Sequence, residues 1–271
     1  MKPEPDVPKV VILAGGLGTR MGEETEYNPK PMVHIGQQPI LWHIMKIYSH
    51  YGFSDFVICL GYKGEVIKDY FVNYDIRNSD ISLELGHKGI TTHTNTKESG
   101  WKITLADTGI NAMTGARVDR IKKYTDSNTF FLTYGDIVAD VDIPDLLEFH
   151  KKHGKIATLT GVTPPSRFGE LSISGEQVKQ FQEKPSKSEA RLINGGFFVM
   201  NQAVFEYLDD ADDCVLEKGP LERLAQDGQL MMYHHTGSWH CMDTLAEARL
   251  LNELWASDRA PWNIWDTADH E

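Results

Sequence analysis

Several kinds of sequence feature are scarce in this chain of 271 residues. It has only three cysteines, which are far apart and show no C-x-x-C spacing (Cys59, Cys214 and Cys241). We therefore expect reduced, structural thiols, and neither a disulfide framework nor a zinc site. Five histidines also lack a regular ligand spacing, so we expect them to be surface or strand residues (His87, His93, His234, His235 and His240). No Ser/His/Asp or Cys/His set that would suggest a nucleophilic enzyme stands out.

Long hydrophobic runs and long basic runs are absent as well. No apolar stretch approaches the about 18 residues that a membrane-spanning helix needs. The opening MKPEPDVPK lacks the apolar core of a secretory signal. The chain has 27 Lys and Arg against 39 Asp and Glu, a formal net charge of −12, and no basic runs, which argues against nonspecific nucleic-acid binding. We expect a soluble cytoplasmic protein that binds anions only through local cations and backbone N–H groups.

The hydrophobic pattern predicts an α/β fold in a single domain over residues 9–271, after a flexible arm over residues 1–8. An apolar run over 9–15 is typical of a strand buried on both faces, and 40–52 has helical periodicity. A strand over 53–62 and a helix over 64–74 repeat this order. The alternation predicts a parallel sheet covered by helices.

Other segments suggest departures from that alternation. Alternating polar and apolar residues over about 75–117 predict an antiparallel, hairpin-like insert. Residues 170–185 predict two short strands around a Ser-Gly turn, and 192–201 a strand pair broken at Gly195-Gly196. An aromatic tail over 260–266 is expected to pack on the body of the protein.

A glycine-rich loop follows the first predicted strand, in the sequence LAGGLGTR (Leu13 to Arg20). This is where α/β sheets bind ligands, and glycines let backbone N–H groups approach phosphate oxygens. The dinucleotide motif G-x-G-x-x-G would need glycine where Met21 stands, and the P-loop motif has no match. Arg20 could hold a phosphate bidentately. Lys30 lies between Pro29 and Pro31, which should keep it in extended backbone with its side chain projecting and exposed.

Two acidic residues end apolar strands. Asp136 in TYGD and Asp243 in CMDT are each placed to bind a hard cation such as Mg²⁺, and helix N-capping is the alternative for both. Glu183 and Lys184 could serve a sugar hydroxyl and a phosphate, or form a charged turn. Asn194 could contact a hydroxyl beside glycines that allow close approach, or belong to a bulge.

The chain resembles the sugar-1-phosphate nucleotidylyltransferases from about Lys9 to Trp265. The resemblance rests on the stretches LAGGLGTR, PKPM, MTGAR, TYGD, FQEKP, NGGFFV and MDT together. It implies a Rossmann-like, mixed but mostly parallel sheet flanked by helices (the nucleotide-diphospho-sugar transferase fold), with a β-rich sugar-binding region. It also implies a homo-oligomer, a trimer or hexamer, and an Mg²⁺-dependent transfer of a cytidylyl group from CTP to α-D-glucose 1-phosphate.

The resemblance also implies roles for single residues. The catalytic cations would be Arg20, Lys30 and Lys184, and the Mg²⁺ ligands Asp136 and Asp243. The nucleotide site would comprise Leu13, Ala14, Gly15, Gly16, Gly18, Thr19, Arg20, Lys30, Ala112, Arg117 and Gly135. The sugar phosphate would contact Gly169, Glu183, Lys184 and Asn194. In the implied reaction a sugar-phosphate oxygen attacks the α-phosphorus in line, and the protein orients and neutralises the phosphates.

The sequence departs from the family pattern at several positions, among them Asn28, His34, Ala112, Ala116, Ile137 and Gly219. These departures leave open another sugar phosphate or phosphorylated acceptor, or another pyrimidine triphosphate. A second hypothesis is a glycosyltransferase of similar fold whose metal motif is Asp140-Val141-Asp142. A third is a non-catalytic nucleotide-binding homologue.

Overall fold

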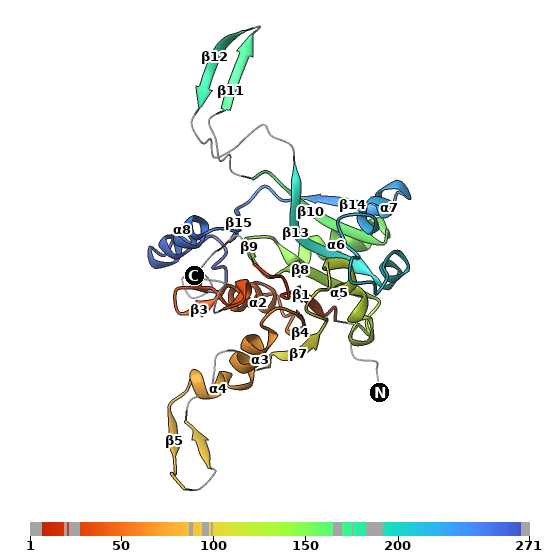
Figure 1. The fold of residues 1–271 in the computed structure, drawn as a ribbon. Helices are drawn as coiled ribbons and strands as arrows, with labels where there is room; N and C mark the ends of the chain where they lie inside the picture. Colours follow the sequence, from red (N-terminus) through yellow and green to blue (C-terminus); the bar gives the residue numbers. More distant parts are fainter. Residues whose placement is uncertain are drawn as a thin grey trace.

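A computed structural model of the protein describes residues 7–18, 21, 28–86, 89–93, 98, 100–164, 170–174, 176–182 and 192–266. Most of the predicted arm over 1–8 lies outside this part of the chain. A mixed seven-stranded sheet forms the centre of the fold, in the order β14-β10-β13-β8-β1-β4-β7 (Figure 1). Its strands are β1 (Val10–Leu13), β4 (Asp55–Leu60), β7 (Lys102–Asp107), β8 (Thr129–Tyr134), β10 (Ala157–Val162), β13 (Ile193–Asn201) and β14 (Leu230–His234).

The pairing confirms the predicted mixed, mostly parallel sheet. β1 runs parallel to both β4 and β8, whereas β13 is antiparallel to β8 and β10. The helices are α2 (Ile40–His50), α3 (Gly64–Val72), α4 (Tyr74–Arg77), α5 (Thr114–Arg120), α6 (Ile143–His153), α7 (Pro220–Gln226) and α8 (Leu245–Ala256). Among the described residues, the 3-10 helices are η2 (Lys30–Met32), η3 (Lys122–Tyr124) and η4 (Gln202–Tyr207).

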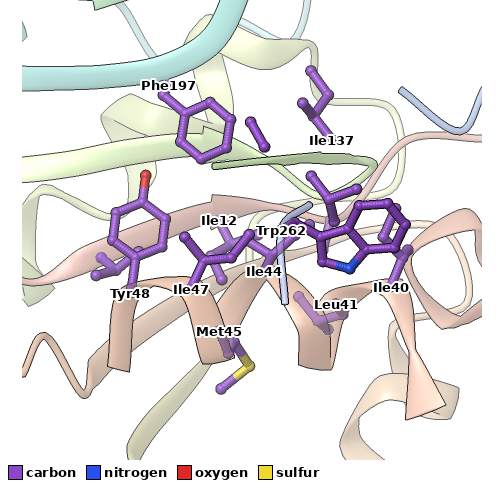
Figure 2. Close-up of a cluster of buried hydrophobic side chains, with 14 of the residues drawn as sticks. Ile12, Ile40, Leu41, Ile44, Met45, Ile47, Tyr48, Ile137, Phe197 and Trp262 are labelled. Carbon is purple, nitrogen blue, oxygen red and sulfur yellow. The ribbon is translucent and has the colours of Figure 1, made fainter. Parts of the chain in front are cut away.

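Two apolar clusters cover the two faces of the sheet, as expected for buried strands. Val10 and Ile12 of β1 join a cluster with α2, α3, α6 and α8, part of which Figure 2 shows. Val11 points the other way and packs with α5, η4 and α7. Alternate side chains of one strand point to opposite faces, so an apolar run without alternation fits a strand covered on both sides.

The insert over 75–117 is smaller than predicted. In the described part of this segment, the antiparallel hairpin is limited to β5 (Ile81–Leu83) and β6 (Ile90–Thr92), and it projects from the body at one end (Figure 1). The segment 102–107 is instead β7, the edge strand of the main sheet, parallel to β4. An edge strand has side chains that are partly exposed, and its alternating pattern resembled that of a hairpin strand.

The predicted break at Gly195-Gly196 is also wrong, because β13 is continuous through both glycines. Gly196 has φ 78°, and the pairing with β10 shifts register nearby, between Leu159 and Gly161. A Cβ on Gly196 would lie 2.6 Å from the Cδ1 atom of Ile137. The glycines therefore provide a bulge and close packing within one strand.

In the described part of the chain, six further short strands lie outside the main sheet as two-stranded pairs. β2 (His34–Ile35) pairs with β3 (Gln38–Pro39), and β9 (Ile137–Ala139) pairs with β15 (Trp239–Cys241). The predicted hairpin over 170–185 is confirmed as β11 (Glu170–Ser174) and β12 (Gln177–Gln182).

The aromatic tail packs on the body of the protein as predicted. Trp262 is completely buried, and Trp265 lies edge to face with Trp42 at 5.8 Å between ring centroids. All three cysteines are unpaired, in agreement with the expected free thiols. Within the described part of the chain, no helix has the length and hydrophobicity needed to cross a membrane.

Candidate active site

A cavity of about 670 Å³ opens at the carboxyl ends of β1 and β8. Its lining comprises Leu13–Gly18, Lys30, Pro31, Ile110–Thr114, Arg117, Tyr134–Ile137, Trp239, Cys241 and Asp243. Eleven residues predicted from the sequence are among them: Leu13, Ala14, Gly15, Gly16, Gly18, Lys30, Ala112, Arg117, Gly135, Asp136 and Asp243. Thr19, Arg20, Gly169, Glu183 and Lys184 lie outside the described residues. Asn194 does not line the cavity, but its Nδ2 donates to the hydroxyl of Tyr134 at 3.1 Å.

The glycine-rich loop is fixed from behind by backbone contacts. The Ala14 N–H donates to the Cys59 carbonyl at 3.1 Å, and the Gly15 carbonyl accepts from the Tyr62 N–H at 3.1 Å. A Cβ on Gly15 would lie 2.2 Å from Nη1 of Arg117, whereas a Cβ on Gly16 would meet nothing within 4 Å. Gly15 is thus required by packing beneath the loop. Gly16 leaves the loop backbone open for a ligand.

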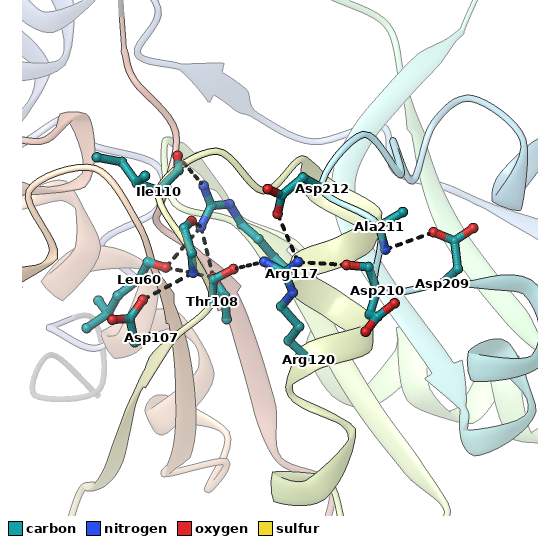
Figure 3. A network of polar contacts seen from close by, with 11 residues as sticks. Leu60, Asp107, Thr108, Ile110, Arg117, Arg120, Asp209, Asp210, Ala211 and Asp212 are labelled. Carbon is teal, nitrogen blue, oxygen red and sulfur yellow. Dashed lines mark hydrogen bonds and ion pairs between the residues drawn. The ribbon is translucent and has the colours of Figure 1, made fainter.

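Arg117 is buried, and its guanidinium holds the loops around the cavity together (Figure 3). Nη1 donates to the carbonyls of Leu60 at 2.9 Å and Gly109 at 2.8 Å and to the Thr108 hydroxyl at 2.8 Å. Nη2 donates to the Gly15 carbonyl at 2.8 Å. Burial lowers the pKa of Arg117 from its ordinary value. These bonds indicate that Arg117 positions the loop, and direct contact with a nucleotide stays a prediction.

Lys30 differs from its prediction in both backbone and exposure. It begins the 3-10 helix η2, and it is only 8% exposed. Its ammonium forms ion pairs with the carboxylates of Asp136 and Asp243. Burial lowers the pKa of Lys30, but the two carboxylates outweigh it and the pKa is raised. No local pattern around Lys30 indicates this burial, because both partners come from distant segments.

Asp136 and Asp243 are brought together by the pairing of β15 with β9. Cys241 lies opposite Ile137 in that pair, and the Met242 N–H donates to the Asp136 carbonyl at 2.9 Å. Neither acid caps a helix: Thr244 is the N-cap of α8, and Asp136 lies in the turn between β8 and β9. Two carboxylates that already share one cation form a donor set suited to a hard metal ion that takes its other ligands from phosphate or water.

The alternative metal motif is not supported by the geometry. Asp140 pairs with His235 at 3.1 Å and accepts from the Ser238 N–H at 2.7 Å. The Asp142 side chain accepts from the Asp145 N–H and caps α6. Neither side chain lines the cavity. Among the residues that the structure describes, no group of three or more His, Cys, Asp or Glu could hold a metal ion.

Sequence reasoning missed several residues of the site. Tyr134 and Trp239 line the cavity, and the Trp239 indole N–H donates to the Gly195 carbonyl at 2.8 Å. Tyr134 directly precedes Gly135-Asp136, so the end of that strand could have suggested it. Glu217, which accepts from Thr114 and Tyr134, lies in a segment without any recognisable motif.

A family model described as nucleotidyl transferase matches residues 9–241. The chain belongs to the nucleotidyl transferase family. It is 51% identical over 259 residues to the glucose-1-phosphate cytidylyltransferase of Salmonella typhi, and 51% identical over 259 residues to that of Salmonella typhimurium. Each match covers 95% of this chain and 100% of the relative.

Solved structures of low sequence identity confirm the fold of this nucleotidyl transferase. A UDP-glucose pyrophosphorylase complexed with UDP-glucose matches with a TM-score of 0.66 and 16% identity, covering 93% of this chain and 100% of that one. HddC from Yersinia pseudotuberculosis matches with a TM-score of 0.64 and 22% identity, covering 92% and 99%.

Proposed function

We propose that this nucleotidyl transferase moves a cytidylyl group from CTP to α-D-glucose 1-phosphate, giving CDP-glucose and pyrophosphate. The observation that supports this most directly is the 51% identity to glucose-1-phosphate cytidylyltransferases over their entire length. The cavity adds chemical support, since it combines an open glycine loop with a lysine and two carboxylates.

The reaction needs no protein nucleophile. An oxygen of the sugar phosphate attacks the α-phosphorus of CTP, the bond to the β-phosphate oxygen breaks, and pyrophosphate leaves with that oxygen. The chain has to hold two anions in line and offset their repulsion. In this proposal the backbone of Leu13–Gly18 would hold the triphosphate, and Lys30 would contact it once released from its carboxylates. Arg20 and Lys184 are proposed as further cations, and Glu183 and Gly169 as sugar contacts.

We propose Mg²⁺ as the cofactor, held by Asp136 and Asp243. Both carboxylates converge on the ammonium of Lys30, which marks a position that a cation can occupy. With only two protein carboxylates, the remaining ligands would be substrate phosphates and water, a common arrangement for Mg²⁺. When bound, Mg²⁺ would neutralise phosphate charge that develops during transfer.

A test of this function is pyrophosphate release from glucose 1-phosphate with Mg²⁺ and CTP, UTP, dTTP, ATP or GTP in turn. Release with CTP alone is expected. Release with another triphosphate would retain the reaction and change the base. No release with any of them would contradict the proposed substrates and favour a different acceptor or a non-catalytic binding role.

A different acceptor or base is the second candidate, and the location of the departures favours it over loss of activity. Ala112 and Ile137 line the cavity, where they can affect what fits. Ala116 is buried in α5, His34 is exposed in β2, and Gly219 is the N-cap of α7 with φ 92°. A screen of sugar phosphates with CTP would separate the two candidates.

We further propose that the protein is a cytoplasmic homo-oligomer, a trimer or hexamer. The β5–β6 hairpin supports self-association, because its apolar side chains are exposed, with Leu85 at 93%. Light scattering after size-exclusion chromatography would measure the subunit number, and a monomer at micromolar concentration would contradict this proposal.

A further inference from the structure

Glu217 lies behind the cavity, in the segment between η4 and α7. It is half-buried and does not line the cavity itself. One carboxylate oxygen accepts from the Thr114 hydroxyl at 2.6 Å, and the other accepts from the Tyr134 hydroxyl. Both donors line the cavity, Thr114 at the start of α5 and Tyr134 at the end of β8. A single carboxylate therefore connects two separate walls of the cavity.

The first wall includes Ala112–Thr114, and the stretch Ala112–Ala116 packs on the segment Asp212–Glu217. The Thr114 hydroxyl accepts from the Leu216 N–H at 2.9 Å, and the Gly115 N–H donates to the Cys214 carbonyl at 2.9 Å. A Cβ on Gly115 would lie 2.5 Å from Sγ of Cys214. This close packing fixes the wall that contains Ala112, which the family resemblance assigns to the nucleotide.

The second wall is Tyr134 together with the strand β13 behind it. The Tyr134 hydroxyl accepts from Nδ2 of Asn194 at 3.1 Å, and Oδ1 of Asn194 accepts from the Gly196 N–H at 2.9 Å. The same hydroxyl donates to a carboxylate oxygen of Glu217. The Asn194 amide, which the family resemblance assigns to the sugar phosphate, is thus linked to Glu217 through Tyr134.

We propose that Glu217 is a positioning residue that couples the nucleotide wall of the cavity to the sugar-phosphate wall. It acts through Thr114 on one side and through Tyr134 and Asn194 on the other. Because a carboxylate accepts hydrogen bonds at both oxygens, a single residue can fix both hydroxyls at once. This inference rests on the proposed function and on the roles that the family resemblance assigns to Ala112 and Asn194.

The test uses variants that keep the shape of each side chain. Tyr134→Phe removes only the hydroxyl and is expected to weaken the binding of glucose 1-phosphate about tenfold or more, with CTP binding changed less than about twofold. Thr114→Val is expected to weaken CTP binding about tenfold or more, with the binding of glucose 1-phosphate changed less than about twofold. Glu217→Gln should weaken the binding of both ligands, because the glutamine amide nitrogen cannot accept a hydrogen bond and one of the two hydroxyls, of Thr114 or Tyr134, loses its acceptor. Calorimetric titration of each ligand with Mg²⁺ present, and KM values from pyrophosphate release, measure these effects.

A matched control is Tyr207→Phe. The Tyr207 hydroxyl also donates to a carboxylate, that of Asp227 at 2.8 Å, but it lies outside the cavity. This variant should bind both ligands like the wild type. The double variant Thr114→Val with Tyr134→Phe should weaken the binding of both ligands, and adding Glu217→Gln to it should cause little further loss, because both donors to Glu217 are already removed.

Two results would overturn the coupling role. One is Glu217→Gln binding both ligands as the wild type does. The other is that every variant weakens the binding of both ligands to the same extent, and that this loss follows its loss of thermal stability. A contact with only a structural role would give this result. Failure of the proposed function looks different, because the wild type itself would then release no pyrophosphate from CTP and glucose 1-phosphate.

Discussion

Replacing Lys30 by methionine tests whether its ammonium occupies the place of a metal ion. Methionine keeps most of the aliphatic volume and removes the charge, so Asp136 and Asp243 would face each other without their shared cation. We expect the variant to be less stable than the wild type without metal, and to bind a divalent cation more tightly. The wild type has to give up two ion pairs before a metal can bind both carboxylates.

The size of the effect follows from the burial of the three groups. Removing one partner of a fully buried ion pair costs about 3–5 kcal/mol. The Asp136 and Asp243 side chains are 26% and 17% exposed, so water partly screens their charges. The free energy of unfolding of Lys30→Met should therefore be lower than that of the wild type by about 2–3 kcal/mol. With an unfolding entropy of roughly 0.6 kcal/mol per kelvin for a chain of this length, the melting temperature should fall by about 4–5 °C.

The assay is thermal unfolding of the wild type and Lys30→Met without metal and with increasing Mg²⁺, together with Mn²⁺ titration followed by electron paramagnetic resonance. A metal at about a hundredfold excess over its Kd stabilises a protein by about 2.7 kcal/mol, which would restore the variant. Lys102→Met is the control, because Lys102 forms an exposed ion pair with Asp55 at 3.0 Å. Lys102→Met should change neither the melting temperature nor the affinity for Mn²⁺ appreciably.

The reasoning would be refuted if Lys30→Met melted at the temperature of the wild type without metal and bound Mn²⁺ no more tightly. If the melting temperature falls and Mg²⁺ does not restore it, the ion pairs of Lys30 stabilise the protein. The proposal that the two carboxylates bind a metal ion would then be wrong.

Three further predictions concern stability. Burial lowers the pKa of His43 to about 4, so its neutral form is favoured in the folded state. The free energy of unfolding should be constant above the ordinary pKa of about 6.5 and fall by about 3 kcal/mol as the pH drops towards 4. Urea unfolding across this range should show a shallower fall for His43→Gln, and an unchanged slope would contradict this. Arg117→Lys should lower the free energy of unfolding by about 2–3 kcal/mol, because one ammonium cannot replace both nitrogens of the guanidinium. It should also weaken CTP binding in calorimetry. Wild-type values in both assays would exclude a positioning role. Gly115→Ala should lower the melting temperature, since its Cβ would lie 2.9 Å from the Cys214 carbonyl oxygen. A melting temperature like that of the wild type would show that the segment around Cys214 moves away without cost.

Much of the fold follows from local sequence patterns. The buried run at Val10–Leu13 and the helical periodicity at Ile40–His50 depend only on neighbouring residues, and both elements are confirmed. Edge position and strand continuity depend on distant partners. For that reason the edge strand Lys102–Asp107 was assigned to the insert, and the strand at Ile193–Asn201 was expected to break.

Local patterns were enough to predict a glycine loop after a buried strand, and acids just after the strands before Asp136 and Asp243. The meeting of these two acids could not be predicted in this way, since the pairing of β15 with β9 joins segments far apart in the chain. The tertiary structure also decided that Lys30 is buried between them, and that Glu217 contacts two walls of the cavity. Long-range pairing creates these contacts, and no pattern within a single segment encodes them.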